Sequence, residues 1–242
     1  MSQPFRLNKE GLINRNKKIS FTFNGKKLFG YEGDTIASAL IANGIHLVGR
    51  SFKYHRPRGF FGAGVEEPNA KLQVEFNGHS EPNVNATEME LVEGLSATSQ
   101  NCWPSVNFDI GAINNFLKMF FPAGFYYKTF MWPKSFWYKI YEPFIRKAAG
   151  LGVASIEKDK ERYEHKFEYC DLLVTGSGPS GLASAYAAAK NGAKVILAED
   201  KPRFGGTLLT DDVSIDNLSG KDWAEKIITC LLYTSPSPRD PM

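Results

Sequence analysis

The stretch that decides the fold runs from Asp171 to Asp200 and reads DLLVTGSGPSGLASAYAAAKNGAKVILAED. Its first apolar run, Leu172 to Val174, is typical of a buried parallel strand, and a glycine-rich turn follows from Gly176 to Gly181. The alanine-rich run from Leu182 to Lys190 predicts a helix, and the Asn-Gly pair after it is a stop signal. A second aliphatic run, Lys194 to Ala198, predicts another strand. The order of strand, turn, helix and strand indicates a Rossmann-type α/β dinucleotide-binding domain.

The glycines of the turn have distinct predicted tasks. Gly176 allows a sharp turn, Gly178 lets a pyrophosphate approach the backbone, and Gly181 lets the helix pack closely on the strand. The helix N-terminus then offers its unpaired N–H groups and its dipole to the phosphates. Glu199 ends the second strand, where a carboxylate can accept hydrogen bonds from both hydroxyls of an adenosine ribose. This position favours NAD or FAD over a cofactor with a 2′-phosphate.

The loop after Glu199 reads PRFGGTL. Its paired glycines suit a chain that passes close under a bound dinucleotide, and its arginine could meet a phosphate or the adenine face. An ordinary flexible surface turn is the alternative. The residues expected to bind the cofactor are Gly176, Ser177, Gly178, Pro179, Ser180, Gly181, Glu199, Asp200, Arg203, Gly206 and Thr207.

Composition restricts the other functions. The 242 residues are 43% hydrophobic and 23% charged, which is ordinary for a globular protein, and a net charge of +3 is too mild to indicate nucleic acid or an anionic membrane as a partner. The three cysteines and four histidines show no spacing typical of a disulfide framework or a metal site. No catalytic motif gives an acid, base or nucleophile. With neither a secretory signal nor a membrane span in the sequence, we expect a cytoplasmic protein.

Residues 1–100 predict a small α+β domain. An Asn-Gly pair marks a tight hairpin turn, and Asp34 is the expected N-cap of a helix from Thr35 to Ala42. Two strands, one helix and further strands are consistent with a ferredoxin-like β-grasp. The predicted strands are Ile19 to Phe23, Leu28 to Tyr31, Lys71 to Phe76 and Thr87 to Val92.

The loop after this helix decides whether the domain holds an iron–sulfur cluster. In plant-type ferredoxins the loop carries cysteines spaced to bind [2Fe–2S]. Here it reads VGRSFKYHRPRGFFGAGVEEPNA and contains no cysteine, so we expect a domain without a cluster. Its interleaved basic and aromatic residues would suit nucleic acid or a phosphate-bearing cofactor. The mild global charge favours a subunit contact or a solvated loop over nucleic acid.

Residues 101–166 differ sharply in composition. Fifteen aromatic residues lie between Trp103 and Phe144, and four prolines interrupt them. Because so short a segment cannot bury all of these side chains itself, we expect them to pack on the chain's own domains or on a partner subunit. The aromatic enrichment favours the partner subunit. The charged run from Ile156 to His165 is expected to be a solvated linker or helix face that leads into the dinucleotide-binding region, residues 167–229.

The end of the chain has another character. Asp222 to Thr229 predicts an amphipathic helix, and the chain then ends CLLYTSPSPRDPM. This ending resembles a translated library-adaptor sequence, so we expect residues 230–242 to be non-native, with a natural disordered tail as the alternative. Two strands do not complete a dinucleotide-binding sheet, so residues 167–229 are predicted to be the truncated start of that domain.

The whole pattern resembles the alpha subunits of heterotetrameric sarcosine oxidases, from about Phe21 to Thr229. The resemblance is carried by GRSFKYHRPRGFFGAGVEEPNA, NCWPSVNFDIGAINNF, FPAGFYYKTFMWP with YEPFIRKAAGLG, and VTGSGPSGLASA. It implies a cluster-free ferredoxin-like domain, a domain that binds NAD through Gly176, Gly178, Gly181 and Glu199, and a C-terminal folate-handling domain. FAD is the less favoured occupant of this chain.

The resemblance also implies a reaction and partners. Such complexes oxidatively demethylate sarcosine to glycine, with flavins held by or against the beta subunit, oxygen as electron acceptor and tetrahydrofolate as one-carbon acceptor. This chain lacks the folate domain and most of the NAD domain, so we expect it to be catalytically inactive as given. The partners that the resemblance implies are the beta subunit and the smaller subunits of the complex. The alternatives are a dehydrogenase for opines or another secondary amine, a free reductase, and a scaffold with a structural nucleotide. A free reductase would need its own flavin or redox disulfide, and no C-x-x-C is present.

Overall fold

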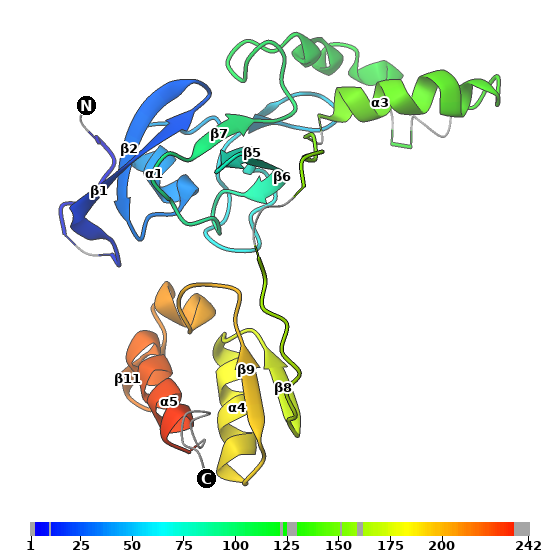
Figure 1. The fold of residues 1–242 in the computed structure, drawn as a ribbon. Helices are drawn as coiled ribbons and strands as arrows, with labels where there is room; N and C mark the ends of the chain where they lie inside the picture. The colour runs from blue at the N-terminus through cyan, green and yellow to red at the C-terminus, as the bar shows by residue number, and fades with distance from the viewer. Residues whose placement is uncertain are drawn as a thin grey trace. The chain divides into compact units, whose positions relative to one another are not determined.

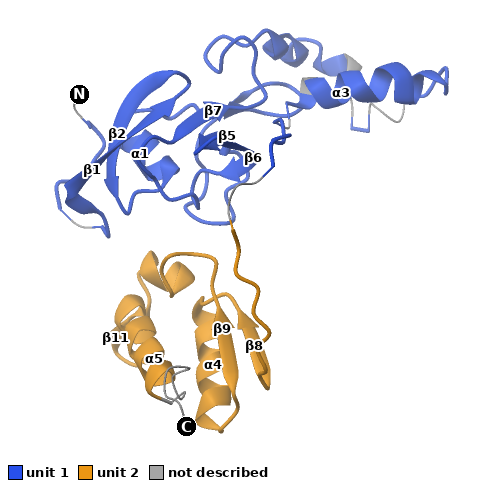
Figure 2. Cartoon of the chain, viewed as in Figure 1, with its two compact units in different colours: residues 1–160 blue, residues 161–242 orange. Residues whose placement is uncertain are grey.

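The structure, a computed structural model, describes residues 3–9, 11–121, 123–124, 130–150, 152–158 and 162–234. The chain divides into two compact units, residues 1–160 and residues 161–242, which Figure 2 colours blue and orange. The finer division at residues 100, 166 and 229 stays a prediction.

The first unit is built on a five-stranded mixed sheet (Figure 1). Its order is β2-β1-β7-β5-β6, with β1 and β7 parallel and the other neighbours antiparallel. Asn24 and Gly25 join β1 to β2 with φ of 49° and 77°, the conformation for which the Asn-Gly pair is favoured. The strands are β1 (Asn14–Phe23), β2 (Lys26–Glu32), β5 (Lys71–Phe76), β6 (His79–Asn85) and β7 (Ser96–Ser99).

The helix α1 (Ile36–Ala42) packs on this sheet and closes the core of the unit. Its apolar residues recur at helical spacing, and alternate residues of the strands face the same core. Each large apolar side chain buried in this way contributes about 1.5–3 kcal/mol to stability. The core includes Phe21, Phe23, Ile36, Leu40, Leu72, Val74, Leu91 and Leu95.

The predicted strand from Thr87 to Val92 is wrong, because this segment caps α1 instead of extending the sheet. The backbone N of Ile36 donates to the Met89 carbonyl at 3.0 Å, and the N of Ala37 donates to the Ala86 carbonyl at 2.8 Å. The first N–H groups of a helix have no partner within the helix, so a neighbouring backbone can satisfy them.

The N-cap of α1 is Thr35 rather than the predicted Asp34. The Thr35 hydroxyl accepts from the Ser38 N–H at 3.2 Å, and the Ser38 hydroxyl accepts from the Thr35 N–H at 3.0 Å, which forms a capping box. The Asp34 carboxylate is buried and accepts from the Arg6 guanidinium at 2.7 and 2.9 Å. Asp34 therefore ties the N-terminal segment to the helix instead of capping it.

The loop between α1 and β5 is organised by the carboxylate of Glu67, whose residue is only 1% exposed. It accepts backbone N–H groups of Phe61, Gly62 and Asn69 at 2.5, 2.6 and 2.7 Å, and that of Ala70 at 3.2 Å. Burial opposes ionisation, but these four bonds together lower the pKa of Glu67. An internal carboxylate thus holds the loop in which a plant-type ferredoxin would carry its cluster ligands. The loop also contains a short hairpin of β3 (Gly49–Arg50) and β4 (Pro57–Arg58).

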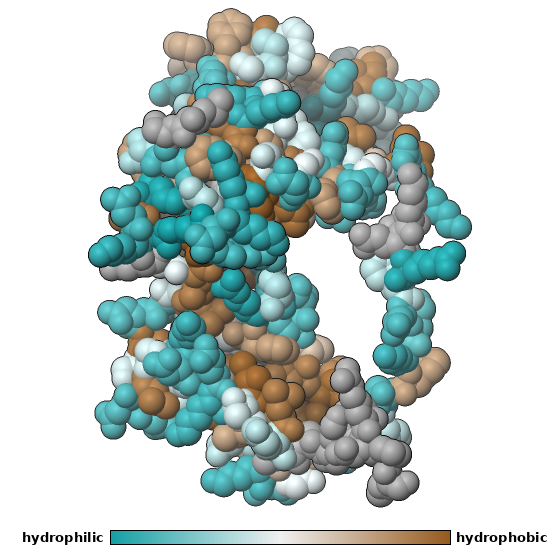
Figure 3. Space-filling model, turned by 60° about the vertical axis from the view of Figure 1, so that its left-hand side comes forward, coloured by the Kyte–Doolittle hydropathy of each residue, from teal (hydrophilic) through white to brown (hydrophobic). Residues whose placement is uncertain are grey.

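The aromatic-rich segment follows β7 as short helical turns. Its exposed apolar side chains include Trp103, Phe116 and Trp132, which are 68%, 83% and 82% exposed. Figure 3 shows that apolar residues reach the surface at several places on one face of the molecule. Of the predicted aromatic group, Phe125, Tyr126 and Tyr127 lie outside the described residues. The turns are η1 (Ile110–Asn115), η2 (Lys118–Phe120), the π-helical turn η3 (Trp137–Tyr141) and the helix α3 (Glu142–Ala149).

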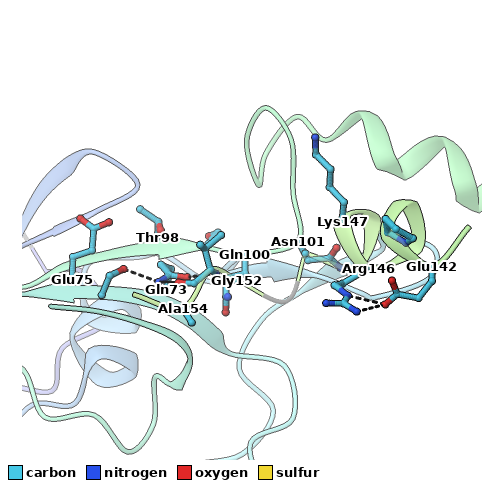
Figure 4. Close-up of a pocket in the computed structure, with 15 residues that line it drawn as sticks. Gln73, Glu75, Thr98, Gln100, Asn101, Glu142, Arg146, Lys147, Gly152 and Ala154 are labelled. Carbon is cyan, nitrogen blue, oxygen red and sulfur yellow. Dashed lines mark hydrogen bonds and ion pairs between the residues drawn. The ribbon is translucent and has the colours of Figure 1, made fainter. Parts of the chain in front are cut away.

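The end of α3 is fixed to the sheet beside a groove of about 950 Å³ (Figure 4). Gln73 donates through Nε2 to the Val153 carbonyl at 3.0 Å and accepts from the Val153 N–H at 3.1 Å. Gly152 adopts φ +75°, and a Cβ there would lie 2.5 Å from the Cβ of Pro82, in a ring that cannot turn away. This close docking requires glycine. The described residues of the charged run beyond it, 156–158 and 162–165, form neither helix nor strand.

The second unit begins with the predicted strand, helix and strand. β8 (Leu172–Thr175) pairs in parallel with β9 (Val195–Ala198), and α4 (Pro179–Lys190) connects them (Figure 1). Asn191 caps α4, as the Asn-Gly pair predicts. The expected burial of β8 is wrong: Leu172 and Leu173 are 37% and 56% exposed, because among the described residues β8 pairs only with β9.

A small core joins α4 to the rest of this unit. Leu182 of α4 packs with Leu208, Trp223, Ala224 and Ile227. The last helix continues past the predicted end at residue 229, and residues 235–242 of the predicted tail lie outside the described residues. The remaining elements are η4 (Gly206–Leu209), β10 (Ser214–Ile215), β11 (Leu218–Ser219) and α5 (Gly220–Thr234).

Candidate functional site: the glycine turn and Glu199

The turn between β8 and α4 presents a helix N-terminus without a side-chain cap. Gly176 turns the chain with φ +87°, and Gly178 is the N-cap residue of α4. Pro179 occupies the first helical position, where its missing N–H costs no intrahelical hydrogen bond. No side chain bonds to the cap, so the N–H groups of the first turn and the helix dipole suit a phosphate group.

Two glycines of the turn meet opposite surroundings. A Cβ on Gly181 would lie 2.0 Å from the carbonyl oxygen of Gly176, so glycine is needed for α4 to pack against the turn. A Cβ on Gly178 would have no atom within 4 Å. The folded chain therefore does not itself require glycine at position 178, and the open space in front of it suits the close approach of a ligand.

Glu199 follows β9 and reaches back to the glycine turn. Its Oε2 accepts the backbone N–H of Ser177 at 2.7 Å and also the Ser177 hydroxyl, and its Oε1 accepts the Lys201 N–H at 3.0 Å. Burial opposes the charge, but the Ser177 and Lys201 hydrogen bonds, with one from Asp200, lower the pKa of Glu199 to about 2. The carboxylate is therefore ionised near neutral pH. Each carboxylate oxygen has two acceptor sites, and Ser177 takes both sites of Oε2, so a further hydroxyl donor would bond to Oε1.

The paired glycines after β9 lie against the turn. The Gly205 N–H donates to both the carbonyl and the hydroxyl oxygen of Ser177, at 3.1 Å each. Gly206 adopts φ +54°, and a Cβ there would lie 3.0 Å from the Cα of Gly178. Ser177 is fully buried and links Glu199 to the second loop, so the two loops form one cradle.

The structure brings only part of the predicted site together. The glycine turn, Glu199 and Gly206 are neighbours. Asp200 also reaches the site, through a side-chain hydrogen bond with Glu199. Arg203 and Thr207 are exposed in the loop that carries Gly206, and the Thr207 carbonyl accepts the Thr210 N–H at 3.1 Å within that loop. Sequence reasoning missed Gly205, which is buried with φ +127° and bonds to Ser177. Its signal was the Gly-Gly pair itself.

The first unit does not fit an iron–sulfur cluster. A [2Fe–2S] cluster needs four protein ligands, of which at least two are cysteines. Cys102 is the only cysteine before residue 170, and burial raises the pKa of its thiol. In the described part of the chain, no three His, Cys, Asp or Glu side chains are grouped so that they could hold a metal ion. No helix in those same ranges is long and apolar enough to cross a membrane.

Family comparisons define the class of the protein. Residues 16–102 match the 2Fe-2S iron-sulfur cluster binding domain family, and residues 171–231 match the FAD dependent oxidoreductase family. The chain is thus a ferredoxin-type domain followed by the start of an FAD-dependent oxidoreductase domain. The crystal structure of L-proline dehydrogenase from P. horikoshii has a similar fold, with a TM-score of 0.51 and 19% identity, over 94% of this chain and 33% of that one.

Individual relatives narrow this class. Sarcosine oxidase subunit alpha of Rhizobium meliloti (strain 1021) is 57% identical over 91% of this chain, and that of Corynebacterium sp. (strain U-96) is 31% identical over 94%. The chain is a homologue of the sarcosine oxidase alpha subunit. It spans 22% and 19% of the length of these two relatives.

Proposed function

We propose that this chain is the nucleotide-binding part of the alpha subunit of a sarcosine oxidase complex, and that the nucleotide is NAD. The observation that carries the proposal is the ionised Glu199 beside the uncapped N-terminus of α4. A phosphate group at the helix end and a ribose at the carboxylate match the two polar parts of an adenine dinucleotide.

Each part of the cradle has a task in this proposal. The N–H groups of the first turn of α4 meet the pyrophosphate, and Gly178 with Gly206 leaves room for it. Oε1 of Glu199 accepts from a ribose hydroxyl, and Ser177 holds the carboxylate in place through Oε2. A 2′-phosphate would meet this carboxylate at close range, so NADP is disfavoured. Asp200, Arg203 and Thr207, at the rim, are proposed to contact the adenine or the phosphates.

The complete complex would carry out the chemistry. We propose that it demethylates sarcosine oxidatively to glycine, with flavins at or near a beta subunit, oxygen as electron acceptor and tetrahydrofolate as one-carbon acceptor. The ferredoxin-type domain would act as a structural domain there, because its residues do not fit a cluster. Opines or other secondary amines are the alternative substrates, and a scaffold with a structural nucleotide is the alternative role.

FAD is the second candidate nucleotide, because residues 171–231 match an FAD-dependent family and Glu199 would serve its ribose equally well. The test is to denature the chain purified with its partner subunits and to separate the released nucleotides by chromatography. The proposal expects about one NAD per alpha chain. The assay is repeated on the Glu199→Gln variant, which should lose the nucleotide of this site and keep the flavin bound elsewhere in the complex. FAD lost with that variant would favour the second candidate, and a chain with neither nucleotide, before or after incubation with both, would contradict the proposal.

A further inference from the structure

The aromatic-rich segment exposes more apolar surface than a monomer usually does. Six of its side chains, here called the aromatic surface, are between 68% and 87% exposed: Trp103, Phe108, Phe116, Met119, Trp132 and Tyr138. All six lie in one segment of the chain, from Trp103 to Tyr138. Large exposed apolar side chains concentrated in this way are typical of a surface that another molecule covers, because apolar area left in water costs about 25 cal/mol per Å².

Buried polar contacts fix the first part of this surface to the sheet domain. Nδ1 of His55 lies 2.6 Å from Oδ2 of Asp109, and both residues are buried. Oδ1 of Asp109 accepts the Trp103 N–H at 3.0 Å, and the Arg50 guanidinium donates to the Val106 carbonyl at 2.6 and 2.8 Å. The loop that carries Trp103 is therefore held in one conformation, as expected of a preorganised interface.

The charges around the aromatic surface have one sign. Between Trp103 and Gly150 the only acidic residues are Asp109 and Glu142, and both are engaged within the chain, with His55 and Arg146. Figure 4 shows the Glu142–Arg146 pair. Lys118, Lys134 and Lys139 are exposed in the same segment. A complementary surface must supply carboxylates around an apolar centre.

We propose that the aromatic surface binds a separate protein subunit whose contact region is apolar at its centre and acidic at its rim. This inference rests on the proposed function, in which the chain is one subunit of a complex. A protein fits better than a bilayer, because only Tyr138 of the six lies on the continuous helical run formed by η3 and α3, and the other five come from loops and short turns. Membrane-surface binding uses a continuous amphipathic helix with separate apolar and basic faces.

The test measures binding of the 242-residue chain to the beta subunit of the Rhizobium meliloti sarcosine oxidase, by isothermal titration calorimetry. The double variant Phe116→Ser/Trp132→Ser removes two exposed aromatic side chains and should weaken binding about tenfold or more. Phe61→Ser is the matched control, because Phe61 is 83% exposed, as Phe116 is, but lies outside the aromatic surface. The control should bind like the unaltered chain. Lys118→Glu/Lys139→Glu should weaken binding and flatten its dependence on salt.

The outcomes separate this inference from the proposed function. If the unaltered chain binds and the aromatic variant binds equally well, the surface is wrong while the subunit proposal stands. If the unaltered chain does not bind the beta subunit, this inference is wrong, and the nucleotide assay then tests the proposed function independently. Two other results would also overturn the inference. One is self-association of the unaltered chain that only the aromatic variant loses. The other is sedimentation with phosphatidylserine-containing vesicles that only the aromatic variant loses. Circular dichroism checks that each variant is folded.

Discussion

Replacing Gly181 by alanine tests the packing on which the nucleotide cradle depends. The new Cβ would lie 2.0 Å from the Gly176 carbonyl oxygen, whereas ordinary van der Waals contact begins at 3.4 Å. Because the carbonyl belongs to the backbone, α4 must move away from it by about 1.4 Å. Forced overpacking of this kind costs about 1–3 kcal/mol. For a unit of this size, each kcal/mol lowers the melting temperature by about 4–8 °C.

Gly178→Ala is the matched control for this substitution. Gly178 has φ −65°, and no atom lies within 4 Å of the position that a Cβ would take there, so the variant should melt like the unaltered chain. It should nevertheless lose affinity for the dinucleotide, because the methyl group occupies the space in which the pyrophosphate approaches. Thermal unfolding followed by circular dichroism and titration with NAD measure the two effects. An unchanged melting temperature for Gly181→Ala, or unchanged affinity for Gly178→Ala, would refute the reasoning.

Three further substitutions test other parts of the structure. The pKa of Glu199 is lowered from 4.5 to about 2 in the folded chain, so the ionised carboxylate stabilises the fold above pH 4.5 and this stabilisation is lost as the pH falls towards 2. In a pH series of melting temperatures, Glu199→Gln should flatten the decrease between pH 4.5 and 2. An unchanged decrease would contradict the prediction. Glu67→Gln replaces a buried acceptor of four backbone N–H groups by an amide, which should lower the free energy of unfolding of the first unit by about 2 kcal/mol or more in urea titrations. Glu66→Gln, at an exposed carboxylate, should change it far less. Gly152→Ala places a Cβ 2.5 Å from that of Pro82 at a residue with φ +75°, and it should release the segment held by Gln73. Faster tryptic cleavage after Lys158 would report the release, and an unchanged rate would show that the segment is not held there.

Local sequence signals predicted most of the regular structure. The Asn-Gly pairs, the alanine-rich run and the alternating strands act through neighbouring residues, so they can be read without knowledge of the fold. The error at Thr87–Val92 has a tertiary cause. The alternation of apolar and polar residues there is compatible with a strand, but also with a segment that caps a helix far away in sequence. The N-cap error at Asp34 is similar, because only the fold brings Arg6 to that carboxylate.

The sequence predicted which loops form the candidate site, but not the hydrogen bonds that join them. The glycine spacing and the acidic end of β9 place the cradle, because a strand, turn, helix and strand can fold together in few ways. The bond from Gly205 to Ser177, and from Ser177 to Glu199, joins residues more than 20 positions apart, and no local pattern indicates it. The role of Glu67 was missed for the same reason, since a carboxylate that binds backbone N–H groups leaves no periodic signal.

The central claim is that Glu199 receives the adenosine ribose of a dinucleotide. The most direct measurement is the ratio of the dissociation constants for NADP and NAD, in the unaltered chain and in Glu199→Gln. The account predicts that the unaltered chain binds NAD about tenfold or more tightly than NADP, and that the variant loses most of this preference while remaining folded. Equal affinities in the unaltered chain, or a preference that survives the substitution, would contradict it.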